Sequence, residues 1–260
     1  MATMRNYEAR PGSRLTLDNH GECSTVDLYS REGFDMLSNL WIKVAAEHRV
    51  MYEPTWLGRP IIQFPTDIVA IQELLWKVQP DVVIETGVAH GGSLILSASI
   101  LELLGRGKVI GVDIEIRPHN RAAIEAHPLK RRIELIEGSS IAPDTVATVR
   151  KLTGDAKVVL VIFDSNHTAA HVLQELKLYA PLVTPGSYMV AHDGAQDWVL
   201  DIPSAKPAWK EGGPLDAIRD FLVAHKEFQV DAHFTRFGIT SSPRGYLKRL
   251  NDAEIAGSRR

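Results

Sequence analysis

Several apolar stretches of this chain end at carboxylates or histidines, which are side chains that can bind ligands or move protons. A β-branched run over residues 82–84 ends at Glu85 and leads into small residues that include Gly87, Gly91 and Gly92. This pattern predicts a strand, a tight turn and a helix start, where backbone N–H groups and the helix dipole face an anionic ligand group. A second apolar run ends at Asp113, which can accept hydrogen bonds from both hydroxyls of a ribose. These residues predict a nucleoside-cofactor site.

The spacing of the glycines indicates which cofactor this would be. The G-x-G-x-x-G pattern of dinucleotide sites is absent, and Glu85 would repel a pyrophosphate. A carboxylate suits a cationic cofactor instead, and the amino group and sulfonium of S-adenosylmethionine are both positive. The pattern E-T-G-x-x-x-G-G-S is similar to the first motif of class I methyltransferases. The alternative is an ordinary strand-to-helix turn in a protein that binds no nucleotide.

A third apolar run ends at Glu137 and is followed by Gly138, Ser139 and Ser140. In an open sheet of this type, the end of the third strand meets the adenine. Small residues and a hydroxyl at this position can line the base or form a hydrogen bond with it. An ordinary strand-to-helix turn explains the pattern equally well.

Two later apolar runs also end at groups that could do chemistry. One ends at Asp164, and the other is followed by His192 and Asp193. Because the carboxyl ends of parallel strands share one edge of a sheet, Asp164 and Asp193 are expected to lie together. Adjacent carboxylates repel unless a proton or cation intervenes, and oxygen ligands favour Mg²⁺, with Mn²⁺ or Ca²⁺ as alternatives. His167 follows three residues after Asp164, where a neutral imidazole could take a proton from an acceptor hydroxyl.

Each of these residues also has a structural interpretation. Asp164 could cap the following helix, Asp193 could be a turn residue, and His167 could be a hydrogen-bonded structural histidine. His192 has three equally open interpretations: it binds the metal, it supports a residue that binds the metal, or it is an ordinary surface residue.

The order of the elements predicts an α/β fold. Strands are predicted near 81–85, 108–112, 132–136, 157–163 and 186–191; helices are predicted near 34–46, 67–78 (capped by Thr66), 92–104, 119–126, 143–152, 168–179 and 214–224. Short apolar strands that alternate with helices indicate a mostly parallel, Rossmann-like sheet with helices on both faces. Segments 228–234 and 243–250 are predicted as edge strands, one of them antiparallel.

The predicted organisation has three parts. Residues 1–60 are expected to form a loose arm, a helix and an aromatic-rich loop that either packs on the core or closes over a ligand as a lid. Residues 61–250 form the predicted methyltransferase domain, and residues 251–260 form a tail with a frayed basic end.

Composition limits the partners of the chain. Its 260 residues suffice for a full core, and its contents of 45% hydrophobic and 23% charged residues are ordinary for a globular protein. A net charge of −3 gives no reason to expect nucleic acid or a membrane surface as a partner. The one cysteine, Cys23, excludes a disulfide within the chain and fits a cytoplasmic protein. There is no apolar stretch of about 20 residues and no signal-peptide pattern.

Several of these segments together resemble a known family. The runs PTD (65–67), IETGVAHGGS (84–93), DIEIRPHNR (113–121), EGSS (137–140) and DSNH (164–167) are similar to the cephalosporin hydroxylase (CmcI-like) family, which includes rhamnosyl O-methyltransferases. The resemblance covers roughly residues 50–195. It implies a class I methyltransferase fold, S-adenosylmethionine and a bound Mg²⁺.

The resemblance also implies roles for single residues. Glu85, Gly87 and Ser93 would hold the methionine end, and the full predicted cofactor set is Glu85, Gly87, His90, Ser93, Asp113, Ser139 and Ser140, although spacing forces no role on His90. Related metal-dependent sugar methyltransferases of macrolide biosynthesis have acidic metal ligands and a histidine base at the positions of Asp164, Asp193 and His167. The chain departs from that pattern at His192, where an acidic residue is usual. His192 could bind the metal through nitrogen, which would favour a softer metal, or water could take its place.

The residues therefore predict a Mg²⁺-dependent S-adenosylmethionine O-methyltransferase that acts on a hydroxyl of a sugar or glycoside. Asp164 and His167 are the predicted catalytic residues, and Asp164, His192 and Asp193 are the predicted metal ligands. One alternative is a non-haem iron hydroxylase or oxidoreductase, because one carboxylate and two histidines are also its ligand set. Another is a non-catalytic partner subunit that keeps the cofactor. The family resemblance favours a homo-oligomer.

Overall fold

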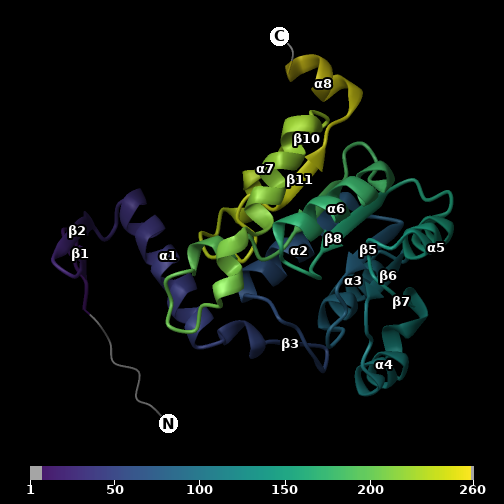
Figure 1. Cartoon of the computed structure of the whole chain (residues 1–260), viewed down its shortest axis with the longest axis horizontal. Coiled ribbons are helices and arrows are strands. Elements are labelled where there is room, and N and C mark those ends of the chain that lie inside the picture. Colours follow the sequence, from purple (N-terminus) through teal and green to yellow (C-terminus); the bar gives the residue numbers. More distant parts are fainter. Residues whose placement is uncertain (1–7, 259–260) are drawn as a thin grey trace.

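Five apolar segments form the parallel strands of a central sheet in the computed structural model, which describes residues 8–258 (Figure 1). They are β5 (Val82–Thr86), β6 (Lys108–Asp113), β7 (Ile133–Glu137), β8 (Val159–Phe163) and β9 (Tyr188–Ala191). The strand order is β10-β11-β9-β8-β5-β6-β7, so β5 pairs with both β6 and β8. The order of the strands reverses there, and open α/β sheets bind ligands beyond the carboxyl ends of the strands at such a point.

The two remaining strands, β10 (Phe228–Val230) and β11 (Tyr246–Arg249), extend the β9 edge of the sheet. β11 runs antiparallel to β9, and β10 runs antiparallel to β11. The prediction of an α/β fold with a mostly parallel sheet and an antiparallel edge is confirmed.

Helices cover both faces of the sheet because every residue of the inner strands β5 and β8 is buried and alternate residues point to opposite sides. Val83 and Leu160 share one core cluster with residues of three helices, α2 (Pro65–Val78), α3 (Gly92–Leu103) and α4 (Pro118–Glu125). Ile84 and Val161 belong to the other cluster, with α5 (Pro143–Thr153), α6 (Ala169–Tyr179) and α7 (Pro214–Ala224). The predicted helices are all present.

The start of α2 differs from the prediction. The helix begins at Pro65, its N-cap is Phe64, and the Thr66 hydroxyl donates to the carbonyl of Ile239 at 2.6 Å. Proline at the first helical position has no N–H that needs a partner, so it starts the helix one residue before Thr66.

The N-terminal segment is more ordered than the predicted loose arm. Strands β1 (Arg14–Asn19) and β2 (Glu22–Asp27) form an antiparallel hairpin, followed by α1 (Arg31–Glu47). His20 and Gly21 at the turn both have positive φ, which suits the right-handed twist of a two-residue hairpin. Figure 1 shows the hairpin and the start of α1 projecting from the body of the protein. Residues 1–7 lie outside the described residues.

The C-terminal tail also contains an element, because α8 (Asp252–Ser258) follows the last strand. The expected frayed end falls on residues 259–260, which lie outside the described residues.

The aromatic-rich segment between α1 and α2 packs against α3. It forms a short 3₁₀ turn, η1 (Val50–Tyr52), and a minimal hairpin of β3 (Thr55–Trp56) and β4 (Arg59–Pro60). The indole N–H of Trp56 donates to the Ser99 hydroxyl of α3 at 3.1 Å. A Cβ on Gly92 would lie 2.2 Å from the Pro60 carbonyl oxygen, so the segment touches the start of α3. In this structure the segment packs on the body of the protein, as one of the two alternatives predicted.

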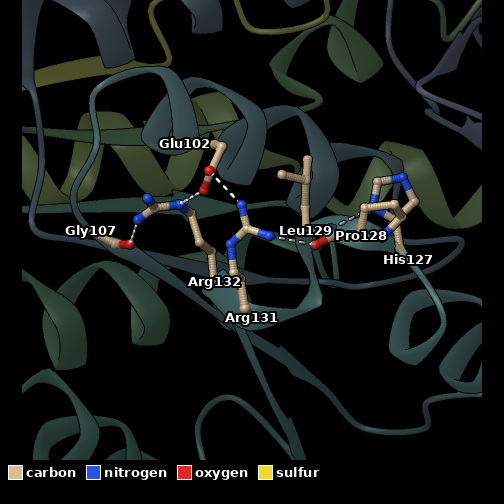
Figure 2. A network of polar contacts seen from close by, with 7 residues as sticks. All are labelled: Glu102, Gly107, His127, Pro128, Leu129, Arg131 and Arg132. Carbon is tan, nitrogen blue, oxygen red and sulfur yellow. Dashed lines mark hydrogen bonds and ion pairs between the residues drawn. The ribbon is translucent and has the colours of Figure 1, made fainter.

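At the β7 edge of the sheet, on the side away from β10, a network of polar contacts joins α3 to the segment before β7 (Figure 2). Glu102, at the end of α3, pairs with both Arg131 and Arg132, and Arg132 also donates to the Gly107 carbonyl at 2.8 Å. Arg132 directly precedes β7, so the network joins the end of one helix to the start of that strand. The two guanidinium groups hold the pKa of Glu102 below its ordinary value.

None of the helices in residues 8–258 combines the length and the apolar character needed to cross a bilayer.

Candidate functional site

Glu85, near the end of β5, is a buried carboxylate. Its side chain is fully buried, and neither carboxylate oxygen has a hydrogen-bond partner among the described residues. Burial raises the pKa of Glu85 to about 8; the nearby Ser93 hydroxyl opposes this rise, and the charge of Asp164 adds to it. A buried carboxylate without a partner carries a large desolvation cost, which an incoming cation would offset. Glu85 therefore fits the cationic methionine end of S-adenosylmethionine.

The turn after Glu85 brings two strand ends into contact. Gly87 has a φ of +95°, and a Cβ there would lie 1.8 Å from the carbonyl oxygen of Asp164. The Asp164 N–H also donates to the carbonyl of Thr86 at 2.8 Å. These backbone contacts hold the ends of β5 and β8 side by side at one edge of the sheet.

Gly87→Ala is expected to prevent stable folding or to abolish cofactor binding. The new methyl group would overlap the Asp164 backbone, and the positive φ would strain any L-residue, so the ends of β5 and β8 would have to separate. Soluble yield, thermal unfolding and calorimetry with S-adenosylhomocysteine would measure this. Gly105→Ala is a matched control, because Gly105 also has a positive φ but a methyl group added there would have no atom within 4 Å. A Gly87→Ala protein as stable and as active as the control would contradict the expectation.

Asp113 holds the glycine-containing turn through its carboxylate. One oxygen accepts from the N–H groups of Val88 and Ala89 at 2.8 and 3.2 Å, and the other accepts from Glu115 at 3.2 Å. A carboxylate can accept about four hydrogen bonds, so these three leave room for a ribose hydroxyl. The predicted ribose role of Asp113 stays a prediction, and the structure adds a role in shaping the turn.

Two residues without a predicted role fix the same turn from outside. Asn120 of α4 donates to the Ala89 carbonyl at 2.9 Å, and Arg59 donates to the His90 carbonyl from two nitrogens, at 2.9 and 2.6 Å. Arg59 also donates to the Asn120 side chain at 3.0 Å. Nδ1 of His90 lies 3.4 Å from the same Asn120 oxygen. The only sequence signal was that Asn120 falls within a family-like run; Arg59 lies in a loop whose packing no local pattern predicts.

The two predicted adenine-side serines differ in their surroundings. Ser140 is buried, and its hydroxyl lies 3.1 Å from Nε2 of His171, while its carbonyl accepts from Tyr179 at 2.8 Å. Ser165 lies 3.4 Å from the same nitrogen and donates to Glu175 at 2.7 Å. Both the hydroxyl and the carbonyl of Ser140 therefore belong to a hydrogen-bond network that joins the ends of β7 and β8 to α6. Ser139 is only partly buried and remains a candidate for contact with the base.

Asp164, His167 and Asp193 form a group that could hold a metal ion. One ligand atom from each residue lies within 4.8 Å of the ligand atoms of the other two. Nε2 of His167 lies 3.1 Å from the Asp193 carboxylate. Burial raises the pKa of Asp164, while the charges of His192 and Asp193 act on it in opposite directions. Two carboxylates and an imidazole fit a divalent cation, which would offset the repulsion between the charges of Asp164 and Asp193.

His192 does not belong to this group of three, although it was predicted as a ligand. Its side chain is buried, Nδ1 lies 2.7 Å from the Ser242 hydroxyl, and Nε2 has no partner among the described residues. The Ser242 N–H donates to the Thr240 hydroxyl at 2.9 Å, and that hydroxyl bonds to buried Asp67 of α2. Sequence reasoning missed this support, since Asp67 and Ser242 are 175 positions apart and only the tertiary fold joins them.

The carboxyl edge of this open α/β sheet places a buried carboxylate without a partner beside Asp164, His167 and Asp193, which we call the metal-competent group, and this is the arrangement expected of a class I methyltransferase. The family model described as Rhamnosyl O-methyltransferase/CmcI matches residues 48–250. The chain belongs to this family and is an O-methyltransferase.

Curated relatives and solved structures agree with this assignment. Over 202 residues the chain is 31% identical to a rhamnosyl O-methyltransferase of Mycobacterium leprae, and this alignment covers 75% of the chain and 82% of the relative. Over 207 residues it is 31% identical to a rhamnosyl O-methyltransferase of Mycobacterium tuberculosis, and this alignment covers 77% of the chain and 80% of the relative. A CmcI structure with Mg and SAM has a TM-score of 0.56 at 20% identity and covers 77% of this chain and 78% of that chain, which shows a shared fold.

Proposed function

We propose that this protein is a Mg²⁺-dependent, S-adenosylmethionine-dependent O-methyltransferase whose acceptor is a sugar hydroxyl, such as one on a deoxyhexose of a glycoside. The observation that carries the proposal is the placement of Asp164, His167 and Asp193 next to the turn that follows Glu85. The donor and acceptor sites then share one edge of the sheet. The names of the curated relatives support a rhamnosyl acceptor, and the CmcI structure with Mg and SAM supports both cofactors.

In this proposal, Glu85 holds the cationic methionine end, with Gly87 and Ser93 around it and His90 at the turn. Asp113 accepts from the ribose, and Ser139 contacts the adenine side. Ser140 contributes by positioning the end of β7. These roles use a buried carboxylate and a turn whose shape Asp113, Asn120 and Arg59 already fix.

The proposed chemistry is transfer of a methyl group from sulfur to an acceptor oxygen. Asp164 and Asp193 would hold Mg²⁺, which supplies Lewis-acid stabilisation of the acceptor oxygen when bound. His167 would take the hydroxyl proton. Its Nε2 lies 3.1 Å from the Asp193 carboxylate and would donate to it, so Nδ1 is the nitrogen that would accept the proton. Alignment of the oxygen with the methyl group supplies much of the lowering of the barrier. His192 is buried and contacts Ser242, and its role as a metal ligand remains a proposal.

Mass spectrometry of candidate glycosides is the direct test. The full chain is incubated with S-adenosylmethionine and Mg²⁺, and a rhamnoside is expected to gain one methyl group. Chelation of the metal is expected to stop the reaction, and added Mg²⁺ or Mn²⁺ to restore it. Transfer that persists at full rate in the presence of a chelator would count against the metal site.

His167→Ala is expected to lower kcat by about 10²-fold or more, which is the usual contribution of a positioned acid or base. The affinity for S-adenosylhomocysteine should not change, because the proposed donor site lies on β5 and β6. His233→Ala is a matched control, since His233 lies in the segment before β11 and is mostly exposed. An unchanged kcat for His167→Ala would remove this residue from the base role.

We propose residues 61–250 as the catalytic domain, which the family match over 48–250 supports. A homo-oligomer and a cytoplasmic location are also proposed.

A further inference from the structure

Glu175 is a fully buried carboxylate of α6 that lies outside the predicted cofactor and metal residues. The other buried residues of this helix are Val172, Leu176 and Tyr179, and all three belong to one hydrophobic core cluster. Burial of a carboxylate carries a desolvation cost, and replacement of a buried charged group by an apolar residue of similar volume is often neutral or stabilising. Stability of the core therefore does not explain a carboxylate at position 175.

The hydroxyl of Ser165 donates a hydrogen bond to Oε1 of Glu175 at 2.7 Å. Ser165 directly follows Asp164 and lies two positions before His167, so it sits between two members of the metal-competent group. Glu175 lies about two turns into α6, where the helix backbone is rigid. The hydrogen bond therefore ties the loop that carries Asp164 and His167 to a fixed point of the helix.

Other contacts hold the two ends of this loop. The Asp164 N–H donates to the Thr86 carbonyl at 2.8 Å where the chain leaves β8, and the Thr168 N–H donates to the Asn166 side chain at 2.9 Å where it enters α6. The hydrogen bond of Ser165 holds the middle. A loop that is held at both ends and in the middle has few accessible conformations, so its two functional side chains keep one separation.

Glu175 is itself held by neighbouring side chains. Nε2 of His171, four residues earlier on α6, lies 3.5 Å from Oε1 of Glu175 and 3.4 Å from the Ser165 hydroxyl. The same nitrogen lies 3.1 Å from the hydroxyl of Ser140, which follows β7. The carboxylate that holds Ser165 is therefore ordered before any ligand binds, and a site built on ordered residues costs less entropy to form.

The charge of Glu175 does not explain its presence. Burial raises the pKa of Asp164, and the negative charges of Asp193 and Glu175 add to this rise. A like charge disfavours the ionised form of Asp164, which is the form that binds a metal ion. The contribution of Glu175 to the site is therefore the hydrogen bond to Ser165.

We propose that Glu175 is a positioning residue for methyl transfer, which holds Ser165 so that Asp164 and His167 keep the separation that metal binding and proton removal require. This proposal rests on the proposed O-methyltransferase function. It adds a residue that touches neither the metal nor the substrate and that acts through Ser165.

The test removes each end of the hydrogen bond in the full chain. Ser165→Ala deletes the donor, and Glu175→Met replaces the acceptor with an apolar side chain of similar length. Each variant is expected to lower kcat and to weaken Mn²⁺ binding by at least ~10-fold, which is the usual effect of losing a group that orients metal ligands. Electron paramagnetic resonance measures Mn²⁺ affinity with S-adenosylhomocysteine present, and kcat is measured with the rhamnoside that gains a methyl group. The KM for S-adenosylmethionine should not change.

Two further variants separate the hydrogen bond from other effects. The double variant Ser165→Ala/Glu175→Met should lose no more than the worse single variant, because both changes remove one contact. Glu175→Gln keeps an oxygen that can accept from Ser165, so it should retain most of the native kcat and Mn²⁺ affinity.

Thr153→Ala is the matched control. It removes a buried hydroxyl that donates to the Val149 carbonyl within α5, far along the chain from the loop after β8. It should keep the native kcat and Mn²⁺ affinity. Thermal unfolding checks that every variant folds, and if Glu175→Met does not fold, Ser165→Ala and Glu175→Gln decide the outcome.

Three results would overturn the proposal: native kcat and Mn²⁺ affinity in folded Ser165→Ala, additive losses in the double variant, or a loss in Glu175→Gln as large as that in Ser165→Ala. In each case the native protein would still bind Mn²⁺ and S-adenosylhomocysteine, and the proposed function would stand. Failure of the native protein to bind either of them would instead overturn the proposed function itself.

Discussion

Asp164→Asn is expected to lower kcat of methyl transfer by about 10³-fold or more. The amide cannot supply the negative charge that a divalent cation needs, and metal stabilisation of a reacting oxygen contributes several kcal/mol. Backbone contacts of Asp164 with Thr86 and the Gly87 turn do not involve the side chain, so the fold should survive. Steady-state kinetics with Mg²⁺ titration would measure the loss, and electron paramagnetic resonance of bound Mn²⁺ would report metal affinity without turnover.

Asp220→Asn is the control for this experiment, because Asp220 is an exposed carboxylate on α7 that pairs only with Arg219 in the described part of the chain. It should retain native kinetics and metal binding. Asp193→Asn should behave like Asp164→Asn, since both carboxylates belong to the same group of three. Native Mn²⁺ affinity in both Asp164→Asn and Asp193→Asn would show that this group does not hold the metal.

Glu85→Gln is expected to stabilise the protein near neutral pH and to abolish cofactor binding. The folded-state pKa of about 8 lies above the ordinary value of 4.5, so the folded protein holds a proton there that the unfolded chain releases. The unfolding free energy therefore falls as the pH rises from about 4.5 to about 8. At pH 7 this effect amounts to about 3 kcal/mol, and the neutral glutamine would not experience it.

The same substitution removes the charge that the cationic methionine end would meet. Thermal unfolding across pH 5–9 should show a flatter slope for Glu85→Gln than for the native protein, and calorimetry should show no binding of S-adenosylmethionine. In the native protein, binding should release a proton below pH 8 and weaken as the pH falls. Glu125→Gln, an exposed carboxylate on α4, is the control and should keep the native slope and affinity. An unchanged cofactor affinity in Glu85→Gln would contradict the assignment of the donor site.

The proximity of the two proposed sites was predictable from short segments. Glu85, Asp113, Asp164 and Asp193 each follow an apolar run, and parallel pairing of those runs places all four at one edge of the sheet. The hairpin of β1 and β2 was not predicted. Leu15 and Leu17 alternate with polar residues in β1, but β2 has no such alternation and nearly all residues of both strands are exposed.

What the sequence by itself determined is the parallel sheet, its order of helices and strands, and the edge at which chemistry can occur, because apolar periodicity and turn residues act over a few neighbouring positions. Only the tertiary structure decided that Glu85 has no hydrogen-bond partner among the described residues and that the Ser140 hydroxyl contacts His171. It also decided that His192 contacts Ser242, which Thr240 links to Asp67. The contact of α1 with a segment about 160 residues later in the chain is likewise a product of the tertiary structure. Burial and long-range hydrogen bonds depend on which distant segments meet, and no local pattern of residue types encodes that meeting.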